Sequence, residues 1–273
     1  MNELVNVDGA ACASISCIQE DGMAWALRVV WNEGVVGLPE ARAWNEAIES
    51  TLAECARLGA AFVDSRVITA SEGVDEGLAS ARASMHRDSL ILHGFERGED
   101  RFEYRMDLGK ALATLEAGKM GHRLAWECVD AGKASELARA ASLLCQASVG
   151  DPASHPDDDA TGFLEALFRK EGAAEVPERL QVGSSDGHPA AILALLSRPA
   201  DGWSTIYYLG ILPAFRGCGL GVEAMLHGLT SLKAMGGRTY HDGTGSRNAA
   251  ARSLFARLGQ PPSLVMEEWR LRL

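Results

Sequence analysis

The stretch from Ile206 to Leu226, IYYLGILPAFRGCGLGVEAML, joins an apolar run to an arginine and three alternating glycines. At Gly217, Gly219 and Gly221 no Cβ stands between the backbone N–H groups and an approaching oxygen atom. The residues that follow have the apolar spacing of a helix, so the loop lies at a helix N-terminus, where unpaired N–H groups and the helix dipole attract anions. Arg216 adds a cation with several hydrogen-bond donors. This combination predicts a site for pyrophosphate.

Three other interpretations of the loop compete with this one. A plain turn would not need an arginine and three glycines before a helix. A dinucleotide site needs Gly-x-Gly-x-x-Gly and an acid about 20 residues later; Asp242 lies near that distance, but Val222 stands at the third glycine position. A P-loop ends in Gly-Lys-Ser/Thr, which this loop lacks. Pyrophosphate binding outside both motifs is therefore favoured.

The strand before the loop is expected to end at Leu212. Pro213 follows it, and a proline has no N–H to donate to a sheet ladder. We therefore expect the strand to part from its neighbour near this proline.

Two motifs carry a resemblance to a known family. LGILPAFRGCGLG resembles the acetyl-CoA loop of the GCN5-related N-acetyltransferase (GNAT) family, whose pattern is apolar-x-apolar-x-Pro-x-x-Arg-Gly-x-Gly-apolar-Gly. Downstream, SRNAAARSLFARLG resembles the family's later motif, Asn-x-x-Ala-x-x-Leu-Tyr-x-x-x-Gly. The resemblance covers about residues 134–273. It implies an α/β fold with a mixed sheet, acetyl-CoA as co-substrate and no metal.

The resemblance also implies binding roles. Main-chain groups of Ile211 and Leu212 would pair with the pantetheine arm, and an amide near them would polarise the thioester carbonyl. Asn248 would touch the same arm. The pyrophosphate would be held by loop amides, those of Arg216, Gly217, Cys218, Gly219, Leu220 and Gly221.

Two positions depart from the family's pattern. Phe255 stands where the family often has a tyrosine that is thought to protonate the departing thiolate, and Gln260 replaces the usual phenylalanine after Gly259. A phenylalanine can pack against the cofactor, but it cannot donate a proton. The motifs therefore support cofactor binding better than they support catalysis.

Acetyl transfer to an amine needs a neutral nucleophile and a route for one proton. His241 ends the strand after Gly237 and is the first candidate for the base, while Asp242 alternates to the other face. Tyr207 and Tyr208 are expected on opposite faces of one strand, so that one of them, with Tyr208 the candidate, faces the acceptor. For His241 or Asp242 taken singly, the favoured interpretation is a polar residue at a strand end that caps the strand or is solvated. Cys218 is expected to be a small spacer in the loop.

The elements around the motifs recur along the chain. A helix over residues 248–258, a left-handed Gly259 and a closing strand follow the same order as a first-half helix, Gly94 and a strand. A second sequence match, at a different offset, aligns Gly59 with Gly236, and each glycine is expected to end a helix. The first half has no Arg-Gly-x-Gly-x-Gly loop. We therefore predict two GNAT-like domains in tandem, a degenerate one over residues 1–120 and a cofactor-binding one over 121–273.

Composition limits the function classes. The chain has 273 residues, 26 Lys and Arg against 37 Asp and Glu, and a net charge of -11, which argues against a nucleic-acid partner. No run resembles a membrane span or a secretory signal. The six cysteines never form Cys-x-x-Cys, and no histidine pair has zinc-site spacing, so reduced thiols, a cytoplasmic location and no metal are expected.

These observations together predict an acetyl-CoA-dependent N-acetyltransferase that acts on a small-molecule or peptide amine by direct attack. The acidic balance favours a cationic amine through electrostatic steering. The first half is expected to shape the acceptor pocket or a homodimer surface. The alternative is a non-catalytic acyl-CoA-binding module.

Overall fold

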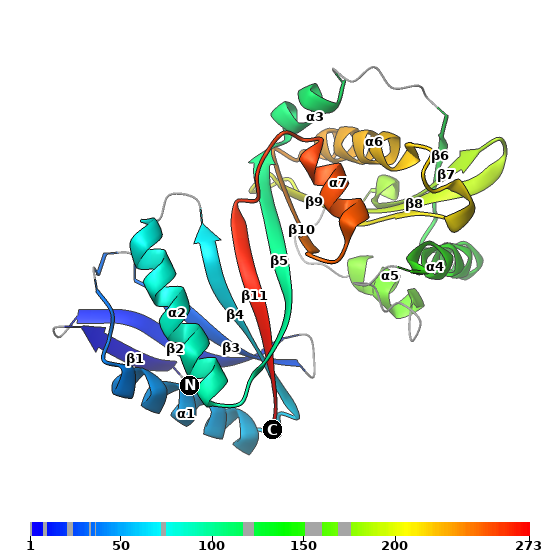
Figure 1. Ribbon diagram of the computed structural model, residues 1–273. Helices are drawn as coiled ribbons and strands as arrows, with labels where there is room; N and C mark the ends of the chain where they lie inside the picture. The colour runs from blue at the N-terminus through cyan, green and yellow to red at the C-terminus, as the bar shows by residue number, and fades with distance from the viewer. Residues whose placement is uncertain are drawn as a thin grey trace. The chain divides into compact units, whose positions relative to one another are not determined.

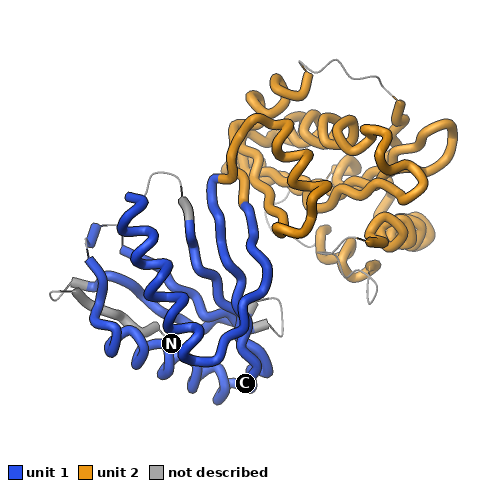
Figure 2. Tube along the Cα trace, viewed as in Figure 1, with its two compact units in different colours: residues 1–102, 263–273 blue, residues 103–262 orange. Residues whose placement is uncertain are grey.

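The computed structural model describes residues 2–7, 10–20, 24–32, 34–35, 37–71, 75–116, 123–150, 160–168 and 176–273. The chain packs as two compact units, unit 1 with residues 1–102 and 263–273 and unit 2 with residues 103–262 (Figure 2). Both are α/β, as the sequence predicted. Within the described ranges, no helix is long and apolar enough to cross a membrane.

The units divide the chain differently from the predicted domains. Residues 263–273, expected in the second domain, pack in unit 1, because strand β11 (Leu264–Arg272) pairs antiparallel with β4 (Phe62–Ser71) along its whole length. The predicted boundary between residues 120 and 121 lies outside the described residues.

Unit 1 is a sheet with strand order β1-β2-β3-β4-β11-β5 and two helices. Strands β3 and β4 run parallel, whereas β1–β2, β2–β3 and β4–β11 are antiparallel. Its remaining elements are β1 (Asn2–Val7), β2 (Ala10–Glu20), β3 (Ala24–Trp31), α1 (Ala41–Arg57), α2 (Glu76–Leu92) and β5 (Glu96–Asp107), whose last residues belong to unit 2.

The core of unit 1 lies between its strands and both helices. Trp44 and Ile48 of α1 and Leu90 of α2 are fully buried in one cluster with inward residues of β2, β3 and β4. A disulfide joins Cys17 of β2 to Cys55 of α1. The expectation of six reduced thiols is therefore wrong for this pair, because packing of α1 on β2 brings together two cysteines that are 38 residues apart.

Unit 2 contains the predicted loop. Its strand order is β5-β10-β9-β8-β7-β6. The elements are α3 (Leu108–Glu116), β6 (Ala125–Cys128), α4 (Ala134–Ser148), α5 (Ala160–Phe168), β7 (Leu180–Ser185), β8 (His188–Arg198), β9 (Trp203–Ile211), α6 (Leu220–Ala234), β10 (Thr239–Gly245) and α7 (Ala249–Ala256), with short 3-10 turns at Pro177–Arg179 and Pro213–Phe215.

Helices cover both faces of the unit 2 sheet. Strand β8 is buried on each face, and its residues alternate between them. Helices α4 and α5 lie on one face and α6 on the other (Figure 1). Ile192 and Ala194 are buried in one cluster with residues of α4 and α5, whereas Ala191 is buried with residues of α6. Strand β8 is therefore a central strand of this sheet.

The predicted recurrence of elements holds in the fold. Unit 1 contains the order β3–α1–β4–α2–β5, and the second half of the chain contains β9–α6–β10–α7–β11. Gly94 and Gly259 follow their helices with φ of 81° and 69°, and Gly59 and Gly236 with 85° and 89°. These are left-handed conformations, which glycine adopts without a Cβ clash.

Candidate functional site

Strands β9 and β10 form the open part of the unit 2 sheet. They run parallel but pair only at Trp203 with Thr239 and at Ser204 with Tyr240. Beyond Ser204 the edge of β9 that faces β10 pairs with no strand of the described residues, whereas its other edge stays paired with β8. The strands thus part near the start of β9, not at Pro213 as predicted.

A bulge in β9 changes the direction of its side chains. Ala194 of β8 pairs with Tyr208, but the next pair joins Leu195 to Ile206, so Tyr207 is an extra residue. Both tyrosine rings consequently pack against the cluster of α4 and α5. The prediction that the two rings lie on opposite faces is wrong, because the bulge interrupts the alternation on which it relied.

The main chain of β9 offers donors to its open side. The N–H of Leu212 donates to the carbonyl oxygen of Ala190 in β8 at 2.9 Å, so it is not available to a ligand. Because successive residues of a strand point their N–H groups to opposite edges, those of Leu209 and Ile211 face away from β8. The open edge is therefore provided by Leu209 and Ile211, and Leu209 was missed because every strand residue carries the same main-chain groups.

The glycine loop lies between the 3-10 turn at Pro213–Phe215 and α6. Gly217 and Gly219 have φ of 76° and 83°, and Gly219 is the N-cap of α6. The amide of Arg216 donates to Pro213 within the turn. No described residue accepts from the next five amides in the chain, those of Gly217, Cys218, Gly219, Leu220 and Gly221. Consecutive N–H groups without a described acceptor, at a helix N-terminus, are the arrangement that binds anions in other proteins.

The side chain of Arg216 does not serve these N–H groups. Its Nη1 and Nη2 donate to the carbonyl oxygens of Val149 and Ala147, both at 2.8 Å, at the C-terminal end of α4. Its Nε donates to the carbonyl oxygen of Ile211 at 3.0 Å. The arginine that the sequence offered as a fixed charge instead satisfies orphan carbonyls of α4 and holds that helix to the end of β9.

A second arginine, from a distant part of the sequence, reaches the loop. Nη1 of Arg123 donates to the carbonyl oxygen of Cys218 at 2.8 Å. Its backbone N–H donates to Oε1 of Glu223 at 2.6 Å, and its Nε lies 3.5 Å from Oε2 of the same carboxylate. Nothing in the sequence singled out Arg123, since it precedes the loop by almost one hundred residues and belongs to no motif.

The later motif also has local roles. Oδ1 of Asn248 accepts from the N–H of Ala251 at 3.0 Å and so caps α7. Phe255 is 4% exposed and stacks on Tyr104 with ring centroids 4.1 Å apart. The stack with β5 explains the burial of Phe255.

His241 lies on β10 just beyond the last residue that pairs with β9. Its ring centroid is 6.0 Å from that of Trp203. Burial and the positive charges of Arg105 and Arg198 lower the pKa of His241, against an opposing effect of Asp201. A lowered pKa keeps the imidazole neutral at pH 7, the form that accepts a proton.

The hydroxyl of Tyr208 and the carboxylate of Asp242 already make hydrogen bonds within the protein. The Tyr208 hydroxyl lies 2.7 Å from Oγ of Ser148 on α4. On the other face of β10, the Tyr240 hydroxyl donates to Asp242, and burial together with this carboxylate raises the pKa of Tyr240 well above its ordinary value. The carboxylate of Asp242 therefore already accepts a hydrogen bond from the buried hydroxyl of Tyr240.

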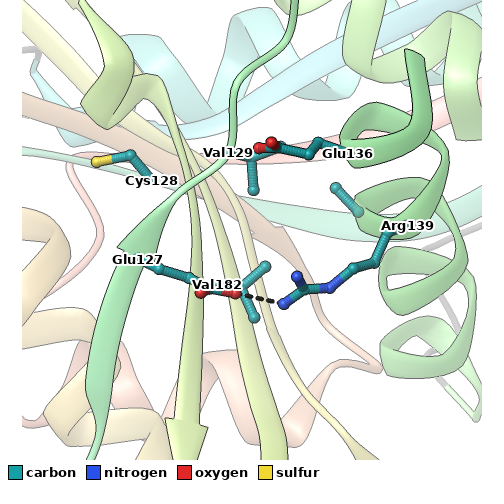
Figure 3. A pocket seen from close by; sticks show the side chains of 7 residues that line it. Glu127, Cys128, Val129, Glu136, Arg139 and Val182 are labelled. Atoms are coloured by element: carbon teal, nitrogen blue, oxygen red, sulfur yellow. Dashed lines mark hydrogen bonds and ion pairs between the residues drawn. The ribbon is translucent and has the colours of Figure 1, made fainter. Parts of the chain in front are cut away.

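A cavity of about 310 Å³ lies at the other edge of the sheet, between β6, β7 and α4 (Figure 3). An ion pair of Arg139 with Glu127 lies in its lining. None of the predicted site residues lines it, and its lining residues are Glu127, Cys128, Val129, Glu136, Arg139, Ala140 and Val182.

The part of the chain that contains the glycine loop matches a known protein family. Residues 143–260 match the model of the acetyltransferase (GNAT) family. No curated protein matches the chain. A tandem GNAT protein from the clavulanic acid biosynthesis pathway is 14% identical, with a TM-score of 0.58 over 98% of this chain and 81% of that one.

Two further solved structures are similar over nearly the whole chain. A GCN5-related N-acetyltransferase from Sphaerobacter thermophilus is 15% identical, with a TM-score of 0.60 over 97% of this chain and 78% of that one. A GCN5-related N-acetyltransferase from Kribbella flavida is 17% identical, with a TM-score of 0.57 over 99% and 88%. At these identities the likeness shows the fold.

Proposed function

The chain contains a GNAT-family domain over residues 143–260 and has the fold of tandem GNAT proteins, and from this premise we propose that it is an N-acetyltransferase that uses acetyl-CoA. The observation that carries the proposal is the row of five unpartnered amides, from Gly217 to Gly221, beside the open edge of β9. The amides suit a pyrophosphate, and the edge suits an extended amide-bearing arm. An acyl-CoA has both parts.

The proposed reaction is direct attack of a neutral amine on the thioester carbonyl. The new N–C bond forms as the C–S bond breaks, the amine loses one proton, and the thiolate leaves. N–H groups on the open side of β9, at Leu209 and Ile211, would orient the pantetheine arm and polarise the carbonyl. Asn248 would contact that arm from the start of α7.

His241 is the proposed proton acceptor, because its imidazole is neutral and lies where β9 and β10 part. The Tyr208 hydroxyl is the second candidate, with its position set by Ser148. Phe255 provides no proton for the thiolate, and we expect solvent to supply it. We propose that the acceptor is a small-molecule or peptide amine, and that the protein forms a homodimer.

One observation favours a second function. Phe255, at the position where the resemblance expects a proton donor, is buried against Tyr104. A chain that binds acyl-CoA at the loop without transferring the acyl group would carry the same features. This alternative is a non-catalytic acyl-CoA-binding module.

Two measurements separate these functions. Calorimetry with acetyl-CoA detects binding, and release of free thiol against a library of amines detects transfer. Binding with thiol release on at least one amine supports the enzyme, and binding with no release on any amine supports the module. Absence of binding would refute both, and titration with NADH would then test the dinucleotide interpretation of the loop.

A further inference from the structure

Arg216, the arginine of the loop, donates its hydrogen bonds away from the loop amides. All three of the hydrogen bonds of the Arg216 guanidinium go to main-chain carbonyl oxygens, at Ile211, Ala147 and Val149. A guanidinium that donates in this way is directed towards the end of α4. A second cation beside the loop amides would therefore add to the attraction of a ligand phosphate.

Arg123 is held at the loop from two sides. Glu223, in the first turn of α6, accepts from the backbone N–H groups of Arg123 and Leu124 through a single oxygen, at 2.6 and 2.8 Å. Its other oxygen lies 3.5 Å from Nε of Arg123. On the opposite side, Nη1 of Arg123 donates to the carbonyl oxygen of Cys218. These contacts fix the plane of the guanidinium.

Nη2 of Arg123 remains for a ligand. It lies 3.5 Å from the position that a Cβ would take on Gly219, in the middle of the unpartnered amides. No described residue accepts a hydrogen bond from it, and the side chain is 49% exposed. A guanidinium whose remaining donors face solvent beside five free amides is suited to a phosphate oxygen.

The charge balance at the loop requires this arginine. The Glu223 side chain is 7% exposed, so a buried negative charge lies in the first turn of the helix that would receive the anion. Without Arg123 that carboxylate would repel a phosphate through a low-dielectric region. Arg123 both neutralises the carboxylate and presents donors to the ligand.

We propose that Arg123 binds a phosphate group of the cofactor, with Glu223 as its positioning residue. This inference rests on the proposed binding of acetyl-CoA at the loop. It replaces Arg216 with Arg123 as the source of side-chain charge, and it adds residues just before β6 to a site that the motifs placed wholly between β9 and α7.

The test compares acetyl-CoA with acetyl-pantetheine, which has the same arm and thioester but no phosphate. Calorimetry on the full chain measures both affinities for the wild type, Arg123→Ala and the control Arg139→Ala. Arg139 is a half-exposed, ion-paired arginine of the same unit. We expect Arg123→Ala to weaken acetyl-CoA binding about tenfold to a hundredfold, with acetyl-pantetheine unchanged. Arg139→Ala should bind both ligands as the wild type does.

A double variant distinguishes phosphate binding from simple neutralisation of Glu223. If Arg123 acts only by cancelling that charge, Arg123→Ala combined with Glu223→Gln should regain wild-type affinity, and the proposal is overturned. If Arg123 contacts the phosphate, the double variant should stay at least about tenfold weaker. Should Arg123→Ala fail to fold, Arg123→Lys keeps the charge and loses the fork, with an expected loss of about threefold to tenfold for acetyl-CoA alone.

The failures of the two proposals are distinguishable. A wild type that binds neither ligand overturns the proposed function and the role of Arg123 together. A wild type that binds acetyl-CoA more tightly than acetyl-pantetheine, with an Arg123→Ala variant that does the same to the same extent, overturns only the role of Arg123.

Discussion

Arg216→Ala tests whether the conspicuous arginine of the loop serves the fold or the ligand. In the structure its guanidinium bonds three carbonyl oxygens, those of Ile211, Ala147 and Val149, at 2.8 to 3.0 Å. Truncation to alanine removes all three bonds at once. The last turn of α4 and the end of β9 then lose the group that joins them.

The expected loss of stability follows from the number of bonds. A hydrogen bond from a charged donor contributes about 1.5–3 kcal/mol when sheltered, but this guanidinium is largely exposed, so we take about 1 kcal/mol each. Three bonds then stabilise unit 2 by about 3 kcal/mol. For a protein of this size, 1 kcal/mol shifts the melting temperature by about 2–4 °C, so the variant should melt about 6–12 °C lower.

The assay is thermal unfolding by calorimetry without ligand, beside Arg139→Ala as control. Arg139 and its partner Glu127 are each 54% exposed, and such a surface ion pair contributes about 0–1 kcal/mol. Arg216→Lys should recover part of the loss, since an ammonium can reach one or two of the carbonyls. An Arg216→Ala variant that melts with the wild type yet binds acetyl-CoA as poorly as Arg123→Ala would refute this reasoning.

Two further predictions concern a buried histidine and a glycine of the loop. Burial lowers the pKa of His86 from 6.5 to about 4, so the unfolded chain binds more protons between these values. The free energy of unfolding should then fall by about 3 kcal/mol as the pH falls from 6.5 to 4. Urea titrations at several pH values measure this fall. If the free energy of unfolding of a His86→Gln variant depended on pH as steeply as that of the wild type, the prediction would be contradicted. Gly219→Ala, at φ 83°, should cost about 1–2 kcal/mol of stability and weaken acetyl-CoA binding. Gly187→Ala, at φ 77° in the β7–β8 turn, should have the same backbone cost without any change in affinity by calorimetry; retained affinity in Gly219→Ala would mean that the loop is misassigned.

Elements with strong local signals could be predicted from the sequence. The end of strand β9 and the helices α6 and α7 have apolar residues at regular spacing and glycines beside them, and they lie within a few residues of the expected positions. Strands β1 and β2 and helix α3 were not predicted. Their sequences are short or irregular in pattern, and partners supplied by other segments determine their conformation.

The candidate site was only partly predictable for a similar reason. The loop glycines and the start of α6 are local features, and their expected positions agree with the structure. The bulge at Tyr207, the hydrogen bond of Leu212 to Ala190 and the three carbonyl bonds of Arg216 all depend on residues distant in sequence. Each is decided by which strand or helix lies alongside.

The sequence by itself determined a glycine-rich loop at a helix N-terminus, because the backbone freedom of glycine and the apolar period of a helix are encoded locally. Only the tertiary structure decided which groups each arginine near that loop contacts. Arg216 and Arg123 have the same side chain, but their contacts differ. Arg216 donates to carbonyl oxygens at the end of α4, whereas Arg123 donates to a carbonyl oxygen of the loop and pairs with Glu223. A residue's chemistry is readable from its type, but its partner follows from the packing of segments that the sequence separates.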